Sequence, residues 1–290
     1  MAATTSTTLS EFIQTVVGRA VDDEIANHLF WPGAIASRWI QVRDLTTTPG
    51  LVASFPKYNA LTAYDLTEGT DYSTTQALDP TATTITITEH GVQGVLTELA
   101  EKNLQSPNAQ AQYVSDLVRN HVRSIMTKYD VDILTLFDSL DDGVENTGTN
   151  LTNAHVLECV NKCALANLPK PWAGFLHPQQ YADLVNEAGS PFADTAASGA
   201  KAAEFYDSYY IARIYDVNWF MTTNAVAINA AADRSGAILS PNAIGAAWGM
   251  MPDTRFENDQ SLRGREVLTV AHYGVGEIDG TMGMYLNSDA

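Results

Sequence analysis

The chain has 290 residues, of which 45% are hydrophobic and 17% charged, and its 16 basic and 34 acidic residues give a net charge of −18. This composition is typical of a globular chain with a full core and excludes a disordered one. No apolar run is long enough to span a bilayer, and the lack of Lys/Arg clusters argues against tight binding of nucleic acid.

The first fifty residues predict an N-terminal arm. Residues 1–10 are rich in Thr and Ser and lack the basic start and apolar core of a secretory signal, so we expect a protein made and used in a cytoplasm. A helical pattern over residues 9–29 is followed by a breaker at residues 30–33 and a second short apolar stretch. Residues 1–50 have too little apolar mass for a core of their own and must pack on another part of the chain.

Residues 51–90 predict a strand, a long polar excursion and a returning strand. The returning segment, residues 83–88, alternates Thr with Ile, which is typical of a strand. A compact domain seldom keeps so long a loop without a purpose. We interpret the segment as an extended two-stranded loop that contacts a neighbouring molecule; the alternative is an ordinary surface hairpin.

Residues 106–140 predict one long helix that acts as a spine for the rest of the chain. Ser106 is the expected N-cap, Pro107 suits the first helical position, and Gly143 is the expected C-terminal stop. At about 1.5 Å per residue the helix would span roughly 50 Å. Apolar residues recur at helical spacing and predict a buried stripe that includes Leu117, Val118, Ile125, Tyr129 and Phe137.

Residues 150–250 predict a mixed α/β domain inserted after the spine. A helix is expected over residues 152–167, with Ala154, Leu157, Val160, Ala164 and Leu165 facing inward, followed by a buried strand at residues 172–176. The last forty residues predict a strand over 267–273, a turn marked by Gly274, Gly276 and Gly280, and a final strand with Met282, Met284 and Leu286. We expect this terminal hairpin to return to the spine, which would make the first domain discontinuous.

No recognisable catalytic motif occurs in the sequence: there is no G-x-S-x-G elbow and no phosphate-binding Walker loop. His155, Cys159 and Cys163 share one helical face and could hold a soft metal, but we favour reduced thiols in a core. The carboxylates of Asp138, Asp141, Asp142 and Glu145 lack the pattern of a calcium loop and are interpreted as a solvated acidic turn. We therefore predict no catalytic, cofactor or metal site.

The order of these parts resembles the major capsid proteins of tailed double-stranded DNA bacteriophages. The segments that carry the resemblance are Phe55-Pro56, residues 66–69, residues 83–89 with 95–97, the spine helix, and residues 264–274. The resemblance implies an α+β chain with the tailed-phage (HK-97-like) capsid fold. It also implies an arm at 1–50, an extended loop at 51–90, a peripheral domain at 91–149 and 252–290, and an axial domain at 150–251.

The function implied by the resemblance is a shell subunit that forms hexamers and pentamers and encloses the phage genome, in a virion assembled in the host cytoplasm. Expected partners are other copies, a scaffolding protein, a portal, possible decoration proteins and DNA contacted non-specifically. Expected contacts lie in the arm, in the loop at Glu68, Gly69, Asp71 and Tyr72, and near residues 236–247. The alternatives are an encapsulin-like compartment shell and a soluble α/β hydrolase that uses His177, Asp183 and Glu187.

Overall fold

The structure is a computed structural model that describes residues 21, 24, 25, 28–31, 34, 36–48, 50–58, 61–71, 75–103, 107–193 and 209–289. Among the helices of these residues, none is long and apolar enough to cross a membrane. The helices and 3-10 turns are η1 (Ala36–Trp39), α2 (Glu98–Asn103), α3 (Pro107–Thr135), η2 (Leu136–Ser139), α4 (Asn153–Leu165), α5 (Pro178–Asn186), η3 (Asn229–Ala231) and η4 (Gly280–Met282). The strands are β1 (Ile40–Asp44), β2 (Val52–Tyr58), β3 (Pro80–Thr86), β4 (Thr88–Thr97), β5 (Asp142–Asn146), β6 (Trp172–Leu176), β7 (Tyr210–Ile214), β8 (Val217–Met221), β9 (Ala227–Ile228), β10 (Asp233–Leu239), β11 (Ile244–Asp259), β12 (Gly264–Glu277) and β13 (Gly283–Asp289).

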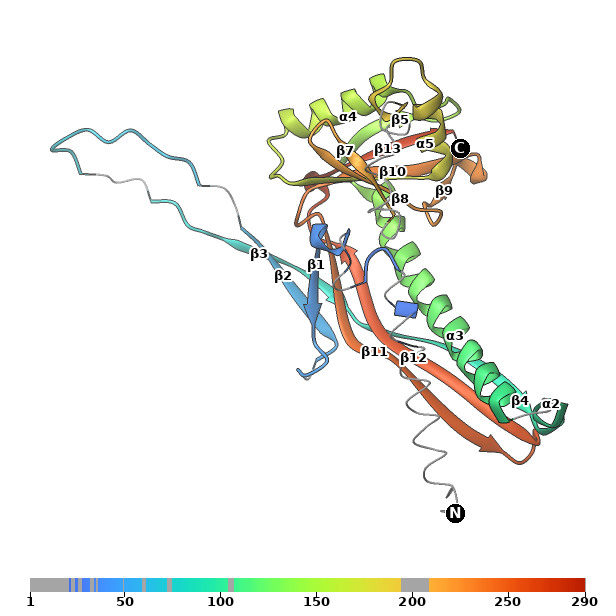
Figure 1. Ribbon diagram of the computed structural model, residues 1–290. Coiled ribbons are helices and arrows are strands. Elements are labelled where there is room, and N and C mark those ends of the chain that lie inside the picture. The colour runs from blue at the N-terminus through green and yellow to red at the C-terminus, as the bar shows by residue number, and fades with distance from the viewer. Residues whose placement is uncertain are drawn as a thin grey trace, which may run out of the picture.

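Helix α3 is the long spine that the apolar periodicity predicts, and it runs beside the β11–β12 hairpin (Figure 1). Its length of 29 residues corresponds to about 44 Å. The helix ends earlier than expected, at Thr135, where the chain tightens into η2. Gly143 is not the helix stop but lies in β5, where a Cβ would come within 2.3 Å of the Tyr285 carbonyl oxygen. Ser106, the expected N-cap, lies outside the described residues.

A four-stranded sheet in the order β1–β11–β12–β4 packs one face against α3. Val118, Ile125 and Tyr129 are at most 2% exposed and lie in one core cluster with Val267, Ala271 and Tyr273 of β12. The rings of Tyr129 and Trp248 approach to 4.7 Å between centroids. Because β11 and β12 are 16 and 14 residues long, this sheet follows most of the spine.

A second sheet, in the order β5–β13–β10–β6–β8–β7 with β9 beside β10, forms the head of the molecule (Figure 1). The sequence predicts that the terminal hairpin returns to the spine, and its first strand, β12, does pack on α3. The prediction is wrong for the last strand, because β13 lies between β5 and β10 in the head. Strand β11 begins at Ile244 and belongs to the other sheet, so the sheets divide the chain at different residues from the expected domain ranges.

Helix α4 covers one face of the head, but its buried side differs from the expected one. Val156, Cys159 and Cys163 are fully buried, whereas Leu157 and Leu165 are 41% and 82% exposed. The observed buried side of α4 is therefore rotated about the helix axis, by part of a turn, from the expected one. The small cysteine side chains fit against β13, where Cys159 Sγ lies 4.0 Å from the Tyr285 carbonyl oxygen.

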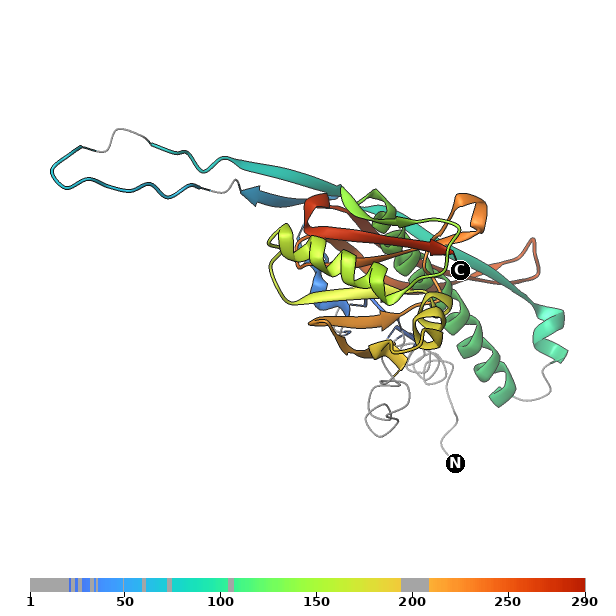
Figure 2. The ribbon, with the colours of Figure 1, turned by 90° about the horizontal axis from the view of Figure 1, so that it is seen from above.

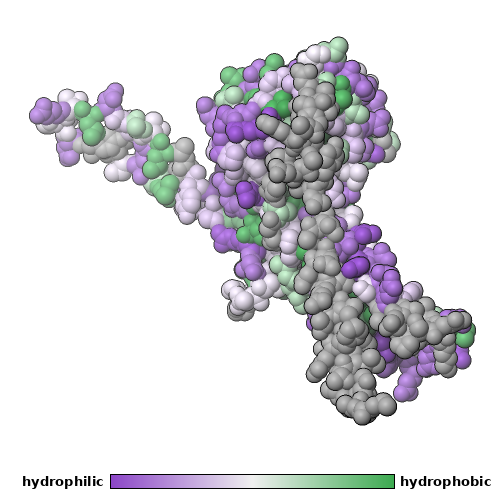
Figure 3. Space-filling model, viewed as in Figure 1, coloured by the Kyte–Doolittle hydropathy of each residue, from purple (hydrophilic) through white to green (hydrophobic). Residues whose placement is uncertain are grey.

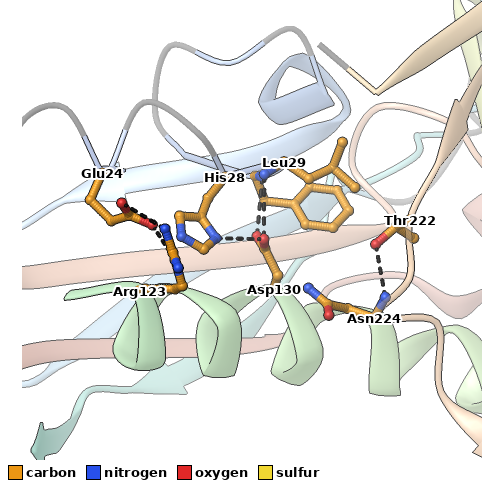
Figure 4. A network of polar contacts seen from close by, with 8 residues as sticks. Glu24, His28, Leu29, Arg123, Asp130, Thr222 and Asn224 are labelled. Atoms are coloured by element: carbon orange, nitrogen blue, oxygen red, sulfur yellow. Dashed lines mark hydrogen bonds and ion pairs between the residues drawn. The ribbon is translucent and has the colours of Figure 1, made fainter. Parts of the chain in front are cut away.

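The described part of the arm is held on the spine by a buried carboxylate (Figure 4). Asp130 is 2% exposed; its Oδ2 accepts a hydrogen bond from the Leu29 N–H at 3.3 Å, and its Oδ1 accepts one from the Phe30 N–H at 3.2 Å. Nδ1 of His28 lies 3.3 Å from the same carboxylate, and Arg123 pairs with Glu24 at 2.6 Å. Residues 28–30 are thus held against α3, as the need for a packing partner predicts. Most of the helix expected over residues 9–29 lies outside the described residues.

Candidate assembly interface

The loop between β2 and β3 projects away from the rest of the molecule (Figures 1 and 2). Strands β2 and β3 pair antiparallel from Val52–Thr86 to Tyr58–Pro80, which confirms the expected outgoing and returning strands. Beyond them, the Thr62 N–H donates to Gln76 Oε1 at 2.9 Å and Gln76 Nε2 donates to the Thr62 carbonyl oxygen at 2.7 Å. This pair of bonds ties the two arms of the loop together.

The tip of the loop contains the expected contact residues. Glu68, Gly69 and Asp71 are exposed, and Gly69 has φ +78°, a conformation that favours glycine. The Thr70 N–H donates to the Thr67 carbonyl oxygen at 3.2 Å and closes the turn. Tyr72 lies outside the described residues. The sequence has no Lys or Arg between Lys57 and Lys102, so the tip is uniformly acidic.

Apolar side chains are exposed along the same loop. Figure 3 shows hydrophobic residues interspersed with hydrophilic ones along the projecting segment. The exposed large apolar residues of the loop and its base are Leu51, Val52, Tyr58, Leu61, Tyr64, Leu66 and Leu78. Exposed apolar side chains cost free energy in water, and a group of them on one projecting element is typical of a protein interaction surface.

The base of the loop is packed on the body by a small core of its own. Phe55 is 0% exposed, and Ala53, Ile85 and Ile87 are at most 4% exposed; they pack with Ala247 and Ile278. The guanidinium of Arg43 lies 5.1 Å above the Phe55 ring. A two-stranded ribbon is at best marginally stable alone, so this small core determines where the loop leaves the body.

Three glycines form the floor under this core. Gly274 and Gly276 were expected to mark a turn, and that expectation is wrong: both lie inside β12, and Gly276 pairs with Gly245 of β11. A Cβ on Gly274 would lie 2.3 Å from the Thr86 carbonyl oxygen, and one on Gly276 would lie 3.1 Å from Ile85 Cγ1. The glycines therefore allow the loop base to lie directly on the sheet, on the face opposite α3.

An ion pair ties the base of the loop to the body at the edge of the small core. Nζ of Lys57 lies 2.7 Å from Oδ1 of Asp279, whose side chain is 5% exposed, and Oδ1 also accepts bonds from the N–H and hydroxyl of Thr281. Burial raises the pKa of Asp279, but the pair with Lys57 and the Thr281 bonds outweigh it and hold the pKa below its usual value. The carboxylate is therefore charged at neutral pH.

The spine residues chosen from the sequence lie far from the loop tip. Val118, Ile125, Tyr129 and Phe137 are at most 2% exposed, with Phe137 in η2, and Leu117 is half-buried against the same cluster. These residues support the body and do not reach the loop. The contact segment expected at residues 236–247 is largely buried inside the chain, because β10 is a central strand of the head, so that expectation is wrong for most of its residues.

Among the residues considered for metal binding or hydrolysis, those described in this paragraph make hydrogen bonds within the chain or lie buried in its core. Nδ1 of His155 lies 2.9 Å from Thr152 Oγ1 at the start of α4, and both cysteines are buried and free. His177 caps α5, and Glu187 accepts from the Asn153 N–H. Among the described residues, no group of three or more His, Cys, Asp or Glu side chains is placed to hold a metal ion.

Asp138 and Glu145, from the acidic turn, both accept hydrogen bonds from the Asn287 amide, and Asp142 pairs with Lys162. Asp138 thus joins η2, at the end of the spine, to β13, while Glu145 joins β5 to β13 and Asp142 joins β5 to α4. They connect elements of the head, a role that the sequence pattern did not indicate.

Comparison with known proteins identifies the fold. No family model and no curated sequence matches the chain. Solved structures do: the capsid of Helicobacter pylori bacteriophage KHP30 has 11% identity and a TM-score of 0.67, and covers 91% of each chain. The capsid of Ralstonia phage GP4 has 14% identity and a TM-score of 0.65, and covers 87% of each chain. A virus-like particle from Pyrococcus furiosus has 10% identity and a TM-score of 0.56, and covers 94% of this chain and 98% of that one. The chain thus has the α+β tailed-phage (HK-97-like) capsid fold.

Proposed function

We propose that this chain is a structural shell subunit, the major capsid protein of a tailed bacteriophage, without a catalytic role. The observation that carries the proposal is the projecting loop, whose apolar and acidic residues are exposed while its base is packed on the body. A contact made by one flank of a subunit to a different flank of the next is heterologous, and repeated heterologous contacts close into rings. Rings of six subunits (hexamers) and of five subunits (pentamers) would together form an icosahedral shell around DNA.

The subunit's acidity suits a container for DNA. A net charge of −18 keeps a polyanion from adhering to the wall, so packaged DNA would be contacted only weakly and without sequence preference. A scaffolding protein, a portal and possible decoration proteins would complete the assembly in the host cytoplasm.

A second candidate is an encapsulin-like compartment shell that houses a protein cargo. It is favoured by the likeness to the Pyrococcus furiosus virus-like particle. Electron microscopy of the protein expressed with its neighbouring genes separates the candidates. Closed particles of megadalton size support a shell, and DNA or protein inside them distinguishes virus from compartment. Small discrete oligomers under every condition would reject both.

Reversing the charge at the loop tip should damage assembly without unfolding the subunit. For Glu68→Lys we expect a free energy of unfolding within about 0.5 kcal/mol of the wild type, because Glu68 is exposed. The yield of particles, measured by sedimentation, should fall severely. The control is Glu158→Lys on the exposed side of α4, which makes the same charge change. Equal particle yields for the two variants would argue against a contact at the loop tip.

Mature particles should contain no covalent cross-link through the loop. Lys57 is the sole lysine of residues 51–90, and it lies at the loop base in an ion pair with Asp279. Denaturing electrophoresis should show one band of monomer size. A ladder of multimers would contradict this expectation.

A further inference from the structure

His121 is a buried imidazole in the joint between the spine and the four-stranded sheet. It lies near the middle of α3 and is 5% exposed. Its Nδ1 lies 3.3 Å from Thr269 Oγ1 of β12, which lies 3.0 Å from Thr254 Oγ1 of β11. Thr269 is fully buried and Thr254 half-buried, so this chain of polar contacts leads from the imidazole toward the surface.

The other ring nitrogen of His121 faces the backbone of β4 at close range. A Cβ on Gly94 would lie 2.9 Å from Nε2, so a side chain larger than glycine would collide with the ring. A neutral imidazole fits this place, whereas an imidazolium would bring a buried charge and a second N–H that needs an acceptor.

No charged side chain compensates for that charge at short range among the described residues. The cross-strand pairs beside the ring, Val92–Thr269 and Gly94–Val267, are uncharged. Burial is the cause that lowers the pKa of His121. The titratable or charged groups further along the three elements that meet here are Glu89 and His90 of β4; Arg265, Glu266, His272, Tyr273 and Glu277 of β12; and Tyr113, Asp116, Arg119, Arg123, Lys128, Tyr129, Asp130 and Asp132 of α3. Glu24 of the arm pairs with Arg123.

His90 is a second imidazole in the same joint. Its ring stacks on Tyr273 at 4.2 Å between centroids, and its Nε2 lies 2.9 Å from Thr88 Oγ1. The Tyr273 hydroxyl donates to Asp132, which pairs with Lys128. Burial, then the charges of Lys128 and His272, lower the pKa of His90, and the opposing charge of Asp132 does not outweigh them. Both imidazoles are therefore neutral at pH 7.

We propose that this joint is an acid-sensitive hinge, in which protonation of His121, supported by His90, loosens the packing of α3 on β4 and β12. Each histidine has a lower pKa in the folded chain than the unfolded value of about 6.5. Its stabilising contribution is thus complete above pH 6.5 and is lost as the pH falls through the folded pKa. Since α3 continues into η2, which lies against the head, loosening would change the angle between the two sheets.

Hydrogen exchange on the full chain at pH 7, 6 and 5 tests the hinge. Protection factors, which are corrected for the intrinsic pH dependence of exchange, are compared for α3 and α4, because α4 belongs to a separate core cluster. In the wild type, protection of α3 should fall about tenfold per pH unit once protonation begins, while α4 stays unchanged. In His121→Gln, protection of α3 should be nearly independent of pH.

The matched control is His177→Gln, which removes a half-buried imidazole from the start of α5 in the head, away from this joint, and should keep the wild-type response of α3. An unchanged acid response in His121→Gln, or no response in the wild type, would overturn the hinge. If His121→Gln does not fold, NMR titration of the His121 ring in the wild type decides the question. His121 must then protonate below the unfolded value of about 6.5, and titration at or above that value would reject the proposal.

Discussion

Replacing Ile125 by aspartate is expected to leave no folded subunit. Ile125 is 2% exposed in the core cluster that joins α3 to the sheet, between Val122 and Tyr129 on the same helical face. Removing its side chain costs about 2–5 kcal/mol, and an unpaired buried carboxylate adds several more. The sum approaches the 5–15 kcal/mol that stabilises a typical domain.

The measurement is the yield of soluble protein, followed by thermal unfolding monitored by circular dichroism. Ser124→Asp is the control, because Ser124 directly precedes Ile125 in the helix and is exposed, so the same new charge meets water there. It should unfold like the wild type. A cooperative unfolding transition for Ile125→Asp at the wild-type temperature would show that α3 is not the spine of the core.

The parts of the fold that follow from local periodicity could be predicted from the sequence. The apolar stripe of α3, the period-2 pattern of β3 and the fully buried β6 each appear where expected. The pairing of β13 with β5 and β10 could not be predicted, because those partners are far away in the sequence and local patterns do not specify which strand a strand will meet.

The error on α4 has a clear physical cause. Because Leu157 and Leu165 are strongly apolar, the sequence pattern predicts that both face inward, and it leaves Cys159 and Cys163 open to a role as metal ligands. In the structure the cysteines act as small apolar residues in the core, while both leucines are exposed. Apolar residues are often exposed on protein surfaces, so hydrophobicity alone does not predict which side of a short helix is buried.

Within the candidate interface, the loop could be predicted and its anchor could not. A long polar excursion between two strands indicates a projecting element, but Gly274 and Gly276 resemble turn residues. Glycines two residues apart lie on the same face of a strand, and there they permit another backbone to approach closely. That reading requires knowing that Ile85 and Thr86 lie above them, which a single sequence does not show.

Adding one methyl group at Gly274 should impair assembly of particles while the subunit still folds. In Gly274→Ala the Cβ would lie 2.3 Å from the Thr86 carbonyl oxygen, a contact that real Cβ atoms do not make, so β3 must move off the sheet. Overpacking of this kind costs about 1–3 kcal/mol, and here it falls on the loop anchor, which is a separate cluster from the two main cores. We expect a folded subunit with a displaced loop and a loss of particles of at least about tenfold.

Gly276 provides the matched comparison, because its Cβ would meet the side chain of Ile85 at 3.1 Å and not a backbone atom. Gly276→Ala should therefore assemble nearly as well as the wild type, since a side chain can shift by a few tenths of an ångström. Gly276→Val should assemble poorly and should be partly rescued by Ile85→Ala, whereas Ile85→Ala should not rescue Gly274→Ala. Particle yield by sedimentation and thermal unfolding of each variant give the two readouts. Wild-type assembly of Gly274→Ala would mean that shell formation does not depend on how the loop base lies on β12.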